Sequence, residues 1–340
     1  MFAWLYGKIA NLRNALYEKG AFKSFSLGAP VVSIGNITAG GTGKTPLVAF
    51  VAEVLAEKGE KVCILTRGYG RENSRKRALV SDGETILEDV KTAGDEPFEL
   101  AQKLLGKALV VADGNRVAAA NWAREKFGVT AFVLDDAFQH RRARRDLDVV
   151  VIDATNPFGR FLREPAKNLK RADLIVITRA NLAKNLSDLK SQISKYNSDC
   201  LILTAENKIS ALIKLEEFPA KAQGSRRPET GDRRQKVLAF CALGNAENFF
   251  EQLRREDFNL VSTQKFSDHY FYKQKDIENL ERKAKQSGAE ILLTTAKDAV
   301  KLKDLQFNLP CFVAESKMIF DDEKKLREII SAVFNPKSKI

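Results

Sequence analysis

The sequence predicts an α/β protein: a P-loop unit with a doubly wound, mostly parallel sheet, followed by a second, smaller α/β domain. Three observations predict this fold class. Short apolar runs alternate with helix-like stretches along most of the chain, and such runs are typical of strands buried on both faces. Within residues 31–46, one such run leads directly into a glycine-rich segment that contains Gly-Lys-Thr-Pro. The 340 residues are 44% hydrophobic, which suffices for about two domains.

Residues 1–22 are predicted to form an amphipathic N-terminal helix. Its apolar face would carry Phe2, Leu5, Tyr6, Ile9, Leu12 and Leu16. Basic residues interrupt the stretch too often for a membrane-spanning helix, and it lacks the cleavage site of a signal peptide, so we expect it to remain in the mature protein. Two interpretations stay open: the helix packs on the chain's own core, or it lies in a membrane interface with Trp4 and Tyr6 as anchors.

The glycine-rich segment is predicted to hold the phosphates of ATP or GTP. Its glycines let backbone N–H groups converge on an anion, and the following helix presents its positive N-terminus. Lys44 would reach the terminal phosphates, and Thr45 can bind Mg²⁺. The predicted nucleotide-binding residues are Thr38, Ala39, Gly40, Gly41, Thr42, Gly43, Lys44 and Thr45. Thr38 stands where the general P-loop pattern has its first glycine, and a glycine-rich turn without a ligand is the alternative interpretation.

Further apolar runs predict the other strands of the first domain, residues 23–213. These runs are residues 61–66, 108–113, 131–136, 148–153, 174–178 and 201–204, and helical stretches such as 98–105 and 116–126 separate several of them. Ligands of such sheets bind at the carboxyl ends of the strands. Several runs end there in polar residues, namely the segment 66–70, Asp113, Asp135, Asp136, Asp153, Thr178 and Arg179.

Residues 214–236 are polar and irregular, which predicts a linker between two domains. Beyond it, residues 237–340 resume the alternation, with strands at 237–243, 260–266, 291–295 and 311–314 and a helix at 276–286. A last helix, residues 321–334, would place Leu326, Ile329, Ile330 and Val333 on one face, so we expect it to pack against the core.

Three charged clusters are candidates for chemistry, and each has a structural alternative. Asp135 and Asp136 end an apolar strand, as a Mg²⁺-binding Walker-B element requires, although many strands end in Asp as a helix cap. Asp95 and Glu96 precede a helix, where a capping role explains them equally well. The third cluster is either a solvated charge run or an anion-binding patch. It comprises Arg141, Arg142, Arg144, Arg145, Arg163, Lys167, Lys170 and Arg171.

The net charge of +12 predicts an anionic partner, which charge alone leaves open between nucleic acid, an acidic membrane surface and a polyanionic substrate. A nucleic-acid partner is not expected, because the chain lacks aromatic stacking platforms and a recognition helix. The four cysteines lie far apart in apolar runs, which predicts reduced thiols and a cytosolic protein. With two histidines and no clustered thiols, a zinc site is not expected either.

Six motifs follow one another in a fixed order. They are GNITAGGTGKTP at 35–46, LTRGYGR at 65–71, AGDEP at 93–97, LDDAFQHRR at 134–142, LREP at 162–165 and FSDHY at 266–270. This set resembles the tetraacyldisaccharide 4'-kinase family of Gram-negative bacteria. The resemblance implies an enzyme that uses ATP and Mg²⁺ to phosphorylate the 4'-hydroxyl of a tetraacylated glucosamine disaccharide 1-phosphate in lipid A biosynthesis. It also implies a cytoplasmic protein attached peripherally to the inner membrane through its N-terminal helix, with no obligate protein partner.

The resemblance also implies roles for individual residues. Residues 38–45 would hold the triphosphate, and Thr38 is what this family has at that position. The implied catalytic residues are Asp95, as the base on the sugar hydroxyl, His269, which tunes it, and Lys44. The implied Mg²⁺ ligands are Thr45 with Asp135 or Asp136. The implied lining of the site comprises Arg67, Tyr69, Glu96, Gln139, His140, Arg163 and Glu164.

The chain departs from the family pattern at three places. Ala137 replaces a glycine after the paired acids, Ala296 replaces an acid, and the loop between Phe158 and Arg163 is shorter. We expect the first departure to alter a tight turn beside the metal and the last to change substrate contacts.

The alternative function is a P-loop nucleotide-switch or partner-loading NTPase. A guanine switch would need an Asn-Lys-x-Asp run at a strand tip. Residues 207–210 lack its acid and residues 294–298 lack its asparagine.

Overall fold

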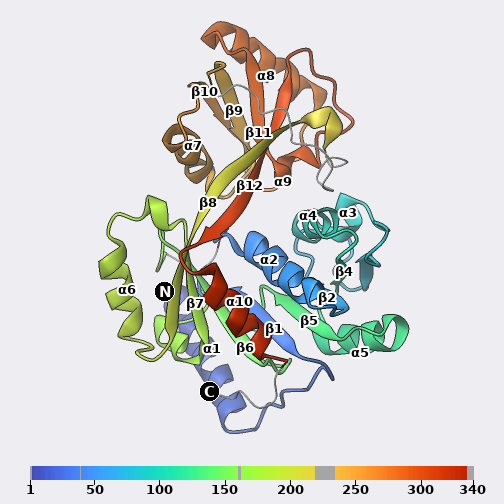
Figure 1. Cartoon of the computed structure of the whole chain (residues 1–340), viewed down its shortest axis with the longest axis vertical. Coiled ribbons are helices and arrows are strands. Elements are labelled where there is room, and N and C mark those ends of the chain that lie inside the picture. The colour runs from blue at the N-terminus through green and yellow to red at the C-terminus, as the bar shows by residue number, and fades with distance from the viewer. Residues whose placement is uncertain (1, 39, 160–161, 219–233, 335–340) are drawn as a thin grey trace. The chain divides into compact units, whose positions relative to one another are not determined.

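A computed structural model describes residues 2–38, 40–159, 162–218 and 234–334, with side chains from residue 7 onward in the first helix. The chain divides into two compact units. Unit 1 comprises Met1–Glu206 with Met318–Ile340, and unit 2 comprises Asn207–Lys317. Both consist of mostly parallel strands with helices packed against them (Figure 1). The α/β fold class predicted from the sequence is therefore confirmed.

The sheet of unit 1 is organised around β1. Its strands are β1 (Val31–Asn36), β2 (Val62–Thr66), β3 (Ala78–Ser81), β4 (Ala108–Ala112), β5 (Ala131–Asp135), β6 (Leu147–Asp153), β7 (Leu174–Thr178) and the first part of β8 (Leu201–Lys214), in the order β8-β7-β6-β1-β5-β2-β4-β3. The pairs are parallel except for β3 with β4. β1 lies between β5 and β6, where the strand order reverses, and doubly wound sheets bind ligands at such a point.

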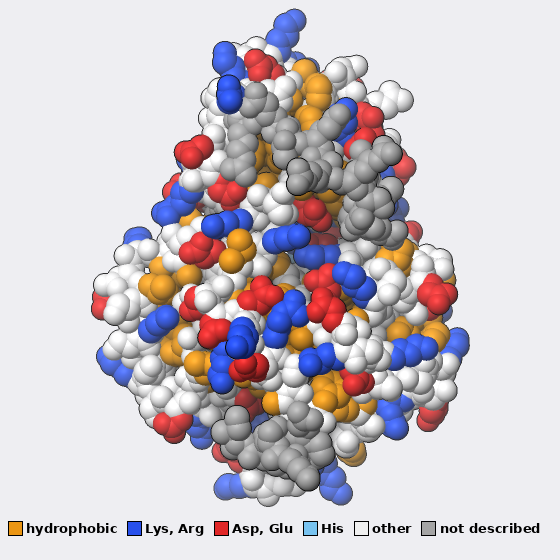
Figure 2. Space-filling view, viewed as in Figure 1, with side chains coloured by type: hydrophobic (Ala, Val, Ile, Leu, Met, Phe, Trp, Pro, Cys, Tyr) orange, Lys and Arg blue, Asp and Glu red, His pale blue; other side chains and the backbone are white. Residues whose placement is uncertain are grey.

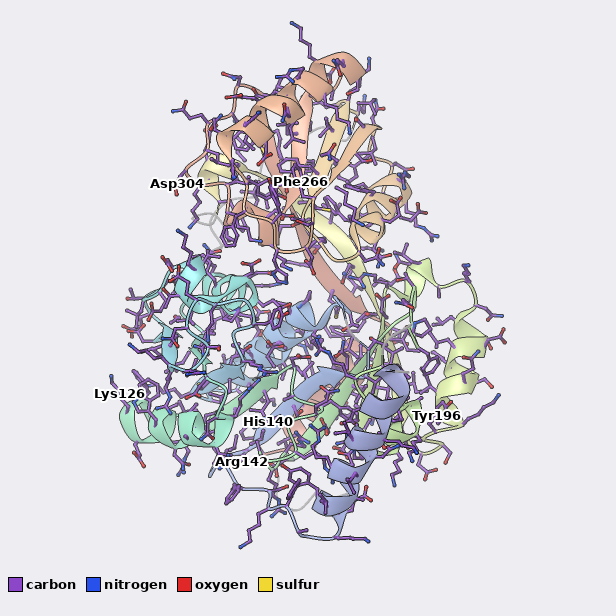
Figure 3. The ribbon with its side chains drawn as sticks, turned by 180° about the vertical axis from the view of Figure 1, so that it is seen from behind. Lys126, His140, Arg142, Tyr196, Phe266 and Asp304 are labelled. Atoms are coloured by element: carbon purple, nitrogen blue, oxygen red, sulfur yellow. The ribbon has the colours of Figure 1, made fainter. Side chains whose placement is uncertain are left out.

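Helices cover both faces of this sheet. α2 (Lys44–Glu57) and α10 (Glu323–Ala332) lie together on the face seen in Figure 1. Arg327 of α10 lies 2.8 Å from Glu57 of α2. α1 (Phe2–Glu18) lies on the other face and comes to the front in the rear view (Figure 3). The remaining helices of unit 1 are α3 (Val90–Ala93), α4 (Asp95–Lys103), α5 (Arg116–Phe127), α6 (Leu186–Ser194) and the 3-10 helices Ala166–Arg171 and Ala180–Leu182.

The core of unit 1 fixes the strand ends that carry the polar residues. Every residue of β2, β4 and β5 is buried, as their continuous apolar runs predict. Ala119, Ala120 and Ala123 of α5 pack on this part of the sheet, and their small side chains let the helix approach closely. Burial of each large strand side chain stabilises the fold by about 1.5–3 kcal/mol.

Unit 2 is a smaller α/β unit with its own core. Its strands β9 (Val237–Cys241), β10 (Leu260–Lys265), β11 (Ile291–Thr295) and β12 (Cys311–Phe320) form parallel pairs in the order β10-β9-β11-β12. α7 (Ala246–Arg255) and α8 (Gln274–Ser287) bury their apolar faces in two separate clusters that include alternate residues of β9. α9 (Ala296–Ala299) and a 3-10 helix, Leu215–Glu217, complete it.

Two strands are longer than the sequence indicates. The apolar runs predict strands at 201–204 and 311–314, whereas β8 ends at Lys214 and β12 at Phe320. Both strands pass from one unit to the other, and along β8 buried and exposed residues are mixed instead of forming one apolar run. The sequence places residues 237–340 in one domain, but α10 falls in unit 1, where it contacts α2. Most of the predicted linker, residues 219–233, lies outside the described residues.

The net charge predicts an anionic partner, and the cysteine positions predict reduced thiols. Lys and Arg side chains alternate with Asp and Glu over the face seen in Figure 2, so on that face the positive surplus forms no single basic field. Cys63, Cys241 and Cys311 are buried and Cys200 is half-buried, and all four are free thiols.

Candidate active site

The glycine-rich loop follows β1 and so lies where the strand order of the sheet reverses. Gly35 of this strand cannot be replaced by a larger residue, because an added Cβ would lie 2.4 Å from the backbone nitrogen of Phe138. Gly43 ends the loop with φ 78°, a conformation that favours glycine, and α2 begins at Lys44. Asn36 Nδ2 donates a hydrogen bond to the Thr42 hydroxyl at 2.9 Å. The N-terminus of α2 thus follows a loop in which backbone N–H groups can converge on an anion.

The carboxylate of Asp136 contacts two cationic side chains, that of Lys44 at the end of the glycine-rich loop and that of Arg163. Lys44 Nζ lies 3.3 Å from Asp136 Oδ1, and Arg163 Nη1 lies 2.6 Å from Asp136 Oδ2. Burial alone would raise the pKa of Asp136, but the charges of Lys44 and Arg163 outweigh it and lower that pKa below its usual value. A carboxylate flanked by two cations at a phosphate loop is suited to hold both cations ready for a polyphosphate.

The turn after β5 accommodates Ala137 without strain. The residue with a left-handed backbone there is Asp136, with φ 50°, and Asp tolerates this conformation better than most residues. Ala137 is fully buried, and its N–H donates to the carbonyl of Ile34 at 3.1 Å. The expected distortion of this turn by alanine is therefore absent.

Asp135 is a buried carboxyl among other acids. The Thr66 hydroxyl donates to it at 2.9 Å, and its exposed fraction is 2%. Burial, together with the carboxylates of Glu96 and Asp136, raises the pKa of Asp135 to about 7 against the opposing effects of Lys44 and the Thr66 hydrogen bond. A divalent cation would relieve this repulsion.

The donor set fits Mg²⁺ held jointly with a nucleotide. Among the described residues, no three Asp, Glu, His or Cys side chains converge to hold a metal by themselves. Mg²⁺ in phosphoryl-transfer sites usually takes one or two carboxylates, phosphate oxygens and water. The carboxyls of Asp135 and Asp136 and the hydroxyl of Thr45, next to Lys44 on α2, would supply the protein's share.

Two segments meet at the start of α4. Gly94 has φ 88° and caps this helix, and a Cβ there would lie 2.8 Å from the carbonyl of Tyr69. Only glycine permits so close an approach, which brings the segment 66–70 beside Asp95 and Glu96. Asp95 is 5% exposed and begins the helix, whereas Tyr69 is 74% exposed. The backbone of Gly94, just before the buried Asp95, therefore lies against the backbone carbonyl of Tyr69.

Gln139, His140 and Arg67 lie around the same strand ends. Gln139 Nε2 donates to the carbonyl of Asn36 at 2.7 Å, so it supports the entry to the loop. Burial and the charges of nearby arginines, of which Arg116 contributes most, together lower the pKa of His140 to about 4. His140 is therefore neutral at neutral pH; Figure 3 shows it on the side of unit 1 that α1 covers. Arg67 is exposed.

Arg116 belongs to this group, although no sequence motif indicated it. Its exposed fraction is 4%, and its charge interacts with Asp135, Asp136 and Arg67. It is the first residue of α5, just after the carboxyl end of β4. Its place just after a predicted strand could have indicated that it belongs to the site, because polar residues at strand ends converge at one edge of a parallel sheet.

Arg163 and Glu164 are neighbours with different surroundings. The N–H of Arg163 donates to the carbonyl of Ile37 at 2.7 Å, which holds the segment beside the glycine-rich loop. Glu164 is fully buried and accepts hydrogen bonds from Arg171 at 2.6 Å, Arg13 at 3.2 Å and Asn14 at 3.3 Å. The Glu164 carboxylate thus contacts both α1 and the 3-10 helix Ala166–Arg171.

His269 lies in unit 2, whereas Asp95 lies in unit 1. Its φ is 60°, and its ring Nε2 lies 3.8 Å from Asp268 Oδ2. Lys297 Nζ is 3.4 Å from the other oxygen of that acid. The pairing of His269 with Asp95 remains a prediction. Ala39, in the loop, lies outside the described residues, as do residues 160–161 of the shortened loop.

Comparisons with known proteins agree with this geometry. A family model described as Tetraacyldisaccharide-1-P 4'-kinase matches residues 1–335. A Tetraacyldisaccharide 4'-kinase of Geobacter metallireducens is 35% identical over 336 residues, which cover 96% of this chain and 95% of that protein. One from Halothermothrix orenii is 37% identical over 310 residues, covering 87% of this chain and 80% of that protein.

A solved structure resembles the whole chain as well. The crystal structure of "apo" form LpxK from Aquifex aeolicus in complex with ATP has a TM-score of 0.77 and 31% identity, and it covers 98% of this chain and 97% of that chain. The match of the family model to almost the entire sequence decides the assignment. The chain belongs to the tetraacyldisaccharide-1-P 4'-kinase family.

Proposed function

We propose that this protein transfers the γ-phosphoryl group of ATP to the 4'-hydroxyl of a tetraacylated glucosamine disaccharide 1-phosphate in lipid A biosynthesis. The observation that carries the proposal is the contact of Lys44 and Arg163 with one carboxylate, that of Asp136, beside the glycine-rich loop. Phosphoryl transfer needs positioned positive charge more than covalent chemistry. Relatives that carry the name of this kinase span nearly the full chain.

The chain's own residues would divide the work. N–H groups of residues 40–45 would hold the β- and γ-phosphates. Lys44 and Arg163 would then leave Asp136 in part and neutralise charge that develops on the transferred group. Mg²⁺, when bound, would neutralise further charge on the phosphates, held by Thr45 with Asp135 or Asp136.

The acceptor hydroxyl needs a group that takes its proton. Asp95 is the proposed base because it is a buried carboxylate at the start of α4, next to the segment 66–70 that ends a neighbouring strand. We propose that His269 orients or tunes it when substrate is bound. Arg67, Tyr69, Glu96, Gln139 and His140 would line the surroundings.

The N-terminal helix supports attachment to the cytoplasmic face of the inner membrane. Ala10 and Asn14 are buried against unit 1, whereas Ile9 is 58% and Leu12 64% exposed. The helix therefore docks with one face and leaves apolar side chains on another, which suits an interfacial helix. Within the described residues, no helix combines the length and apolarity needed to span a membrane.

Exposed basic residues lie near this apolar face in the sequence. Lys8, Lys19 and Lys23 are exposed, and Phe22, which follows the helix, is 45% exposed. Apolar side chains bordered by lysines are attracted to a surface of anionic lipids. This charge pattern favours a membrane surface as the anionic partner that the net charge predicts.

The test is transfer of radiolabel from γ-labelled ATP to the purified lipid disaccharide in mixed micelles. We expect labelled lipid in amounts that depend on Mg²⁺ and on Lys44, with Arg327→Ala as the control that leaves transfer unchanged. Release of labelled phosphate without labelled lipid would instead favour the P-loop nucleotide-switch or partner-loading NTPase.

A further inference from the structure

The carboxyl ends of β6 and β7 carry three polar residues that the proposed mechanism does not use. We call Asp153, Thr178 and Arg179 the β6–β7 tip. Thr178 is fully buried and Asp153 is 4% exposed, so neither is an ordinary surface residue. Arg179 has a left-handed backbone with φ 52°. Such a conformation is unfavourable for most residues and persists where the surroundings fix it.

Two residues of the β6–β7 tip donate hydrogen bonds to carbonyl groups of the glycine-rich loop. The Thr178 hydroxyl donates to the carbonyl of Thr42 at 2.8 Å, and Arg179 Nη1 donates to the carbonyl of Gly41 at 3.1 Å. The Thr178 side chain also lies 3.6 Å from where a Cβ would stand at Gly43. The tip therefore contacts two consecutive loop residues, Gly41 and Thr42, and lies close to the third, Gly43.

Asp153 holds Arg179 in place. The same Nη1 that reaches the loop forms an ion pair with Asp153 Oδ2. The other carboxylate oxygen accepts hydrogen bonds from the N–H and the hydroxyl of Thr155, at 2.9 and 2.8 Å. Both oxygens are thus engaged, and the guanidinium is tied to the strand end.

These contacts determine which way the loop's N–H groups point. In a trans peptide, the carbonyl and the N–H of the next residue point in opposite directions. Holding the carbonyls of Gly41 and Thr42 toward the β6–β7 tip turns the N–H groups of Thr42 and Gly43 away from it. N–H groups fixed on one side of such a loop bind phosphate.

We propose that Thr178 and Arg179, supported by Asp153, are positioning residues that keep the loop's N–H groups oriented for the phosphates of ATP. The inference rests on the proposed function because it takes ATP as the ligand. It adds residues that lie outside the loop and outside the implied lining of the site. Their role is exerted on the protein's backbone and is present before nucleotide binds.

The test is direct ATP binding by titration calorimetry on the full chain, with the melting temperature of the nucleotide-free protein measured in parallel. Thr178→Val removes the hydroxyl at nearly constant shape, and Thr178→Ser keeps it. Arg179→Asn removes the guanidinium and suits the left-handed backbone, and Arg179→Lys keeps one charged nitrogen. We expect Thr178→Val and Arg179→Asn each to weaken ATP binding about tenfold, as loss of one such hydrogen bond predicts, with Thr178→Ser near wild type and Arg179→Lys intermediate.

Arg327→Ala is the matched control, because this arginine also pairs with carboxylates, Glu57 and Glu323. Glu57 ends α2, about 20 Å from the loop by helical rise. The control should bind ATP as the wild type does. Unchanged ATP affinity in both Thr178→Val and Arg179→Asn would overturn the proposal, whether or not their melting temperatures fall. A wild-type protein that binds ATP but phosphorylates no lipid would overturn the proposed function and leave this inference standing.

Discussion

Replacing Glu164 by alanine should destabilise unit 1 strongly. The Glu164 side chain is 0% exposed and pairs with the Arg171 guanidinium, which is 12% exposed, at 2.6 Å. Arg171 also stacks over the Phe138 ring, with 3.9 Å between guanidinium carbon and ring centroid. The alanine variant would leave this cation buried without its carboxylate and would remove an acceptor that Arg13 and Asn14 of α1 share.

The expected size follows from the burial of the pair. Removing one partner of a buried ion pair costs about 3–5 kcal/mol. In a unit of this size, 1 kcal/mol shifts the melting temperature by about 2–4 °C, so Glu164→Ala should lower it by about 6–20 °C. Glu164→Gln keeps an acceptor oxygen, so its melting temperature should lie between those of the wild type and Glu164→Ala. Arg13→Ala removes a partner that is 36% exposed and should cost about 1 kcal/mol or less.

The assay is scanning calorimetry of the nucleotide-free variants, together with kcat and KM for the lipid. The resemblance implies that Glu164 lines the substrate site, whereas its contacts indicate that it anchors α1 and the segment next to Arg163. If Glu164→Ala melted within about 2 °C of wild type, the buried-anchor reasoning would be refuted. A raised lipid KM at unchanged melting temperature would restore the substrate-contact role.

Four further outcomes follow from the site and the N-terminal helix. Lys44→Ala should lower kcat by at least a hundredfold, with little change in the melting temperature of the nucleotide-free protein; near-normal turnover would contradict the phosphate-loop assignment. Ile9→Asp with Leu12→Asp should abolish binding to anionic vesicles in a flotation assay and raise the KM for lipid more than that for ATP, while retained flotation would contradict membrane binding through this face of α1. Asp95→Ala should reduce kcat far more than ATP affinity, and the loss in a double variant with His269→Ala should be much smaller than the product of the single losses; fully multiplicative losses would separate the two residues. The pKa of Asp135 is raised to about 7 from its ordinary 3.8, so between these values the side chain is protonated in the folded protein but ionised in the unfolded chain. Its contribution to stability is therefore complete below about pH 4 and is lost as the pH rises to about 7. Over that range the melting temperature of Asp135→Asn should fall less than that of the wild type, and parallel profiles would contradict the raised pKa.

Periodicity and glycine chemistry were sufficient to predict the frame of the site. Continuous apolar runs predict β2, β4 and β5, whose residues are all buried. The break of β1 into a glycine-rich loop predicts where α2 begins, because the required backbone conformations favour glycine. The carboxyl-end rule then predicts that polar residues after separate strands gather at one edge. These signals are local in sequence, which is why sequence alone carries them.

Side-chain direction and long-range pairing could not be predicted in this way. Nothing in the order of Arg163 and Glu164 shows that one contacts Asp136 while the other is buried against α1. Arg116 was missed because a lone arginine at a helix start has no distinctive pattern. The full lengths of β8 and β12 were missed because their outer parts mix exposed and buried residues. The turn at Asp136 was also mispredicted: its left-handed residue is Asp136, so Ala137 in place of a glycine does not distort it.

The most direct test of the proposed kinase activity is the position of the transferred phosphate. Phosphorus–proton correlation NMR of the lipid product, made with ATP, Mg²⁺ and the purified disaccharide 1-phosphate, would locate it. The proposed function predicts a second phosphorus signal coupled to the proton at the 4' carbon, absent when Lys44→Ala replaces the wild type. A product phosphorylated elsewhere, or ATP consumed with the lipid unchanged, would contradict it.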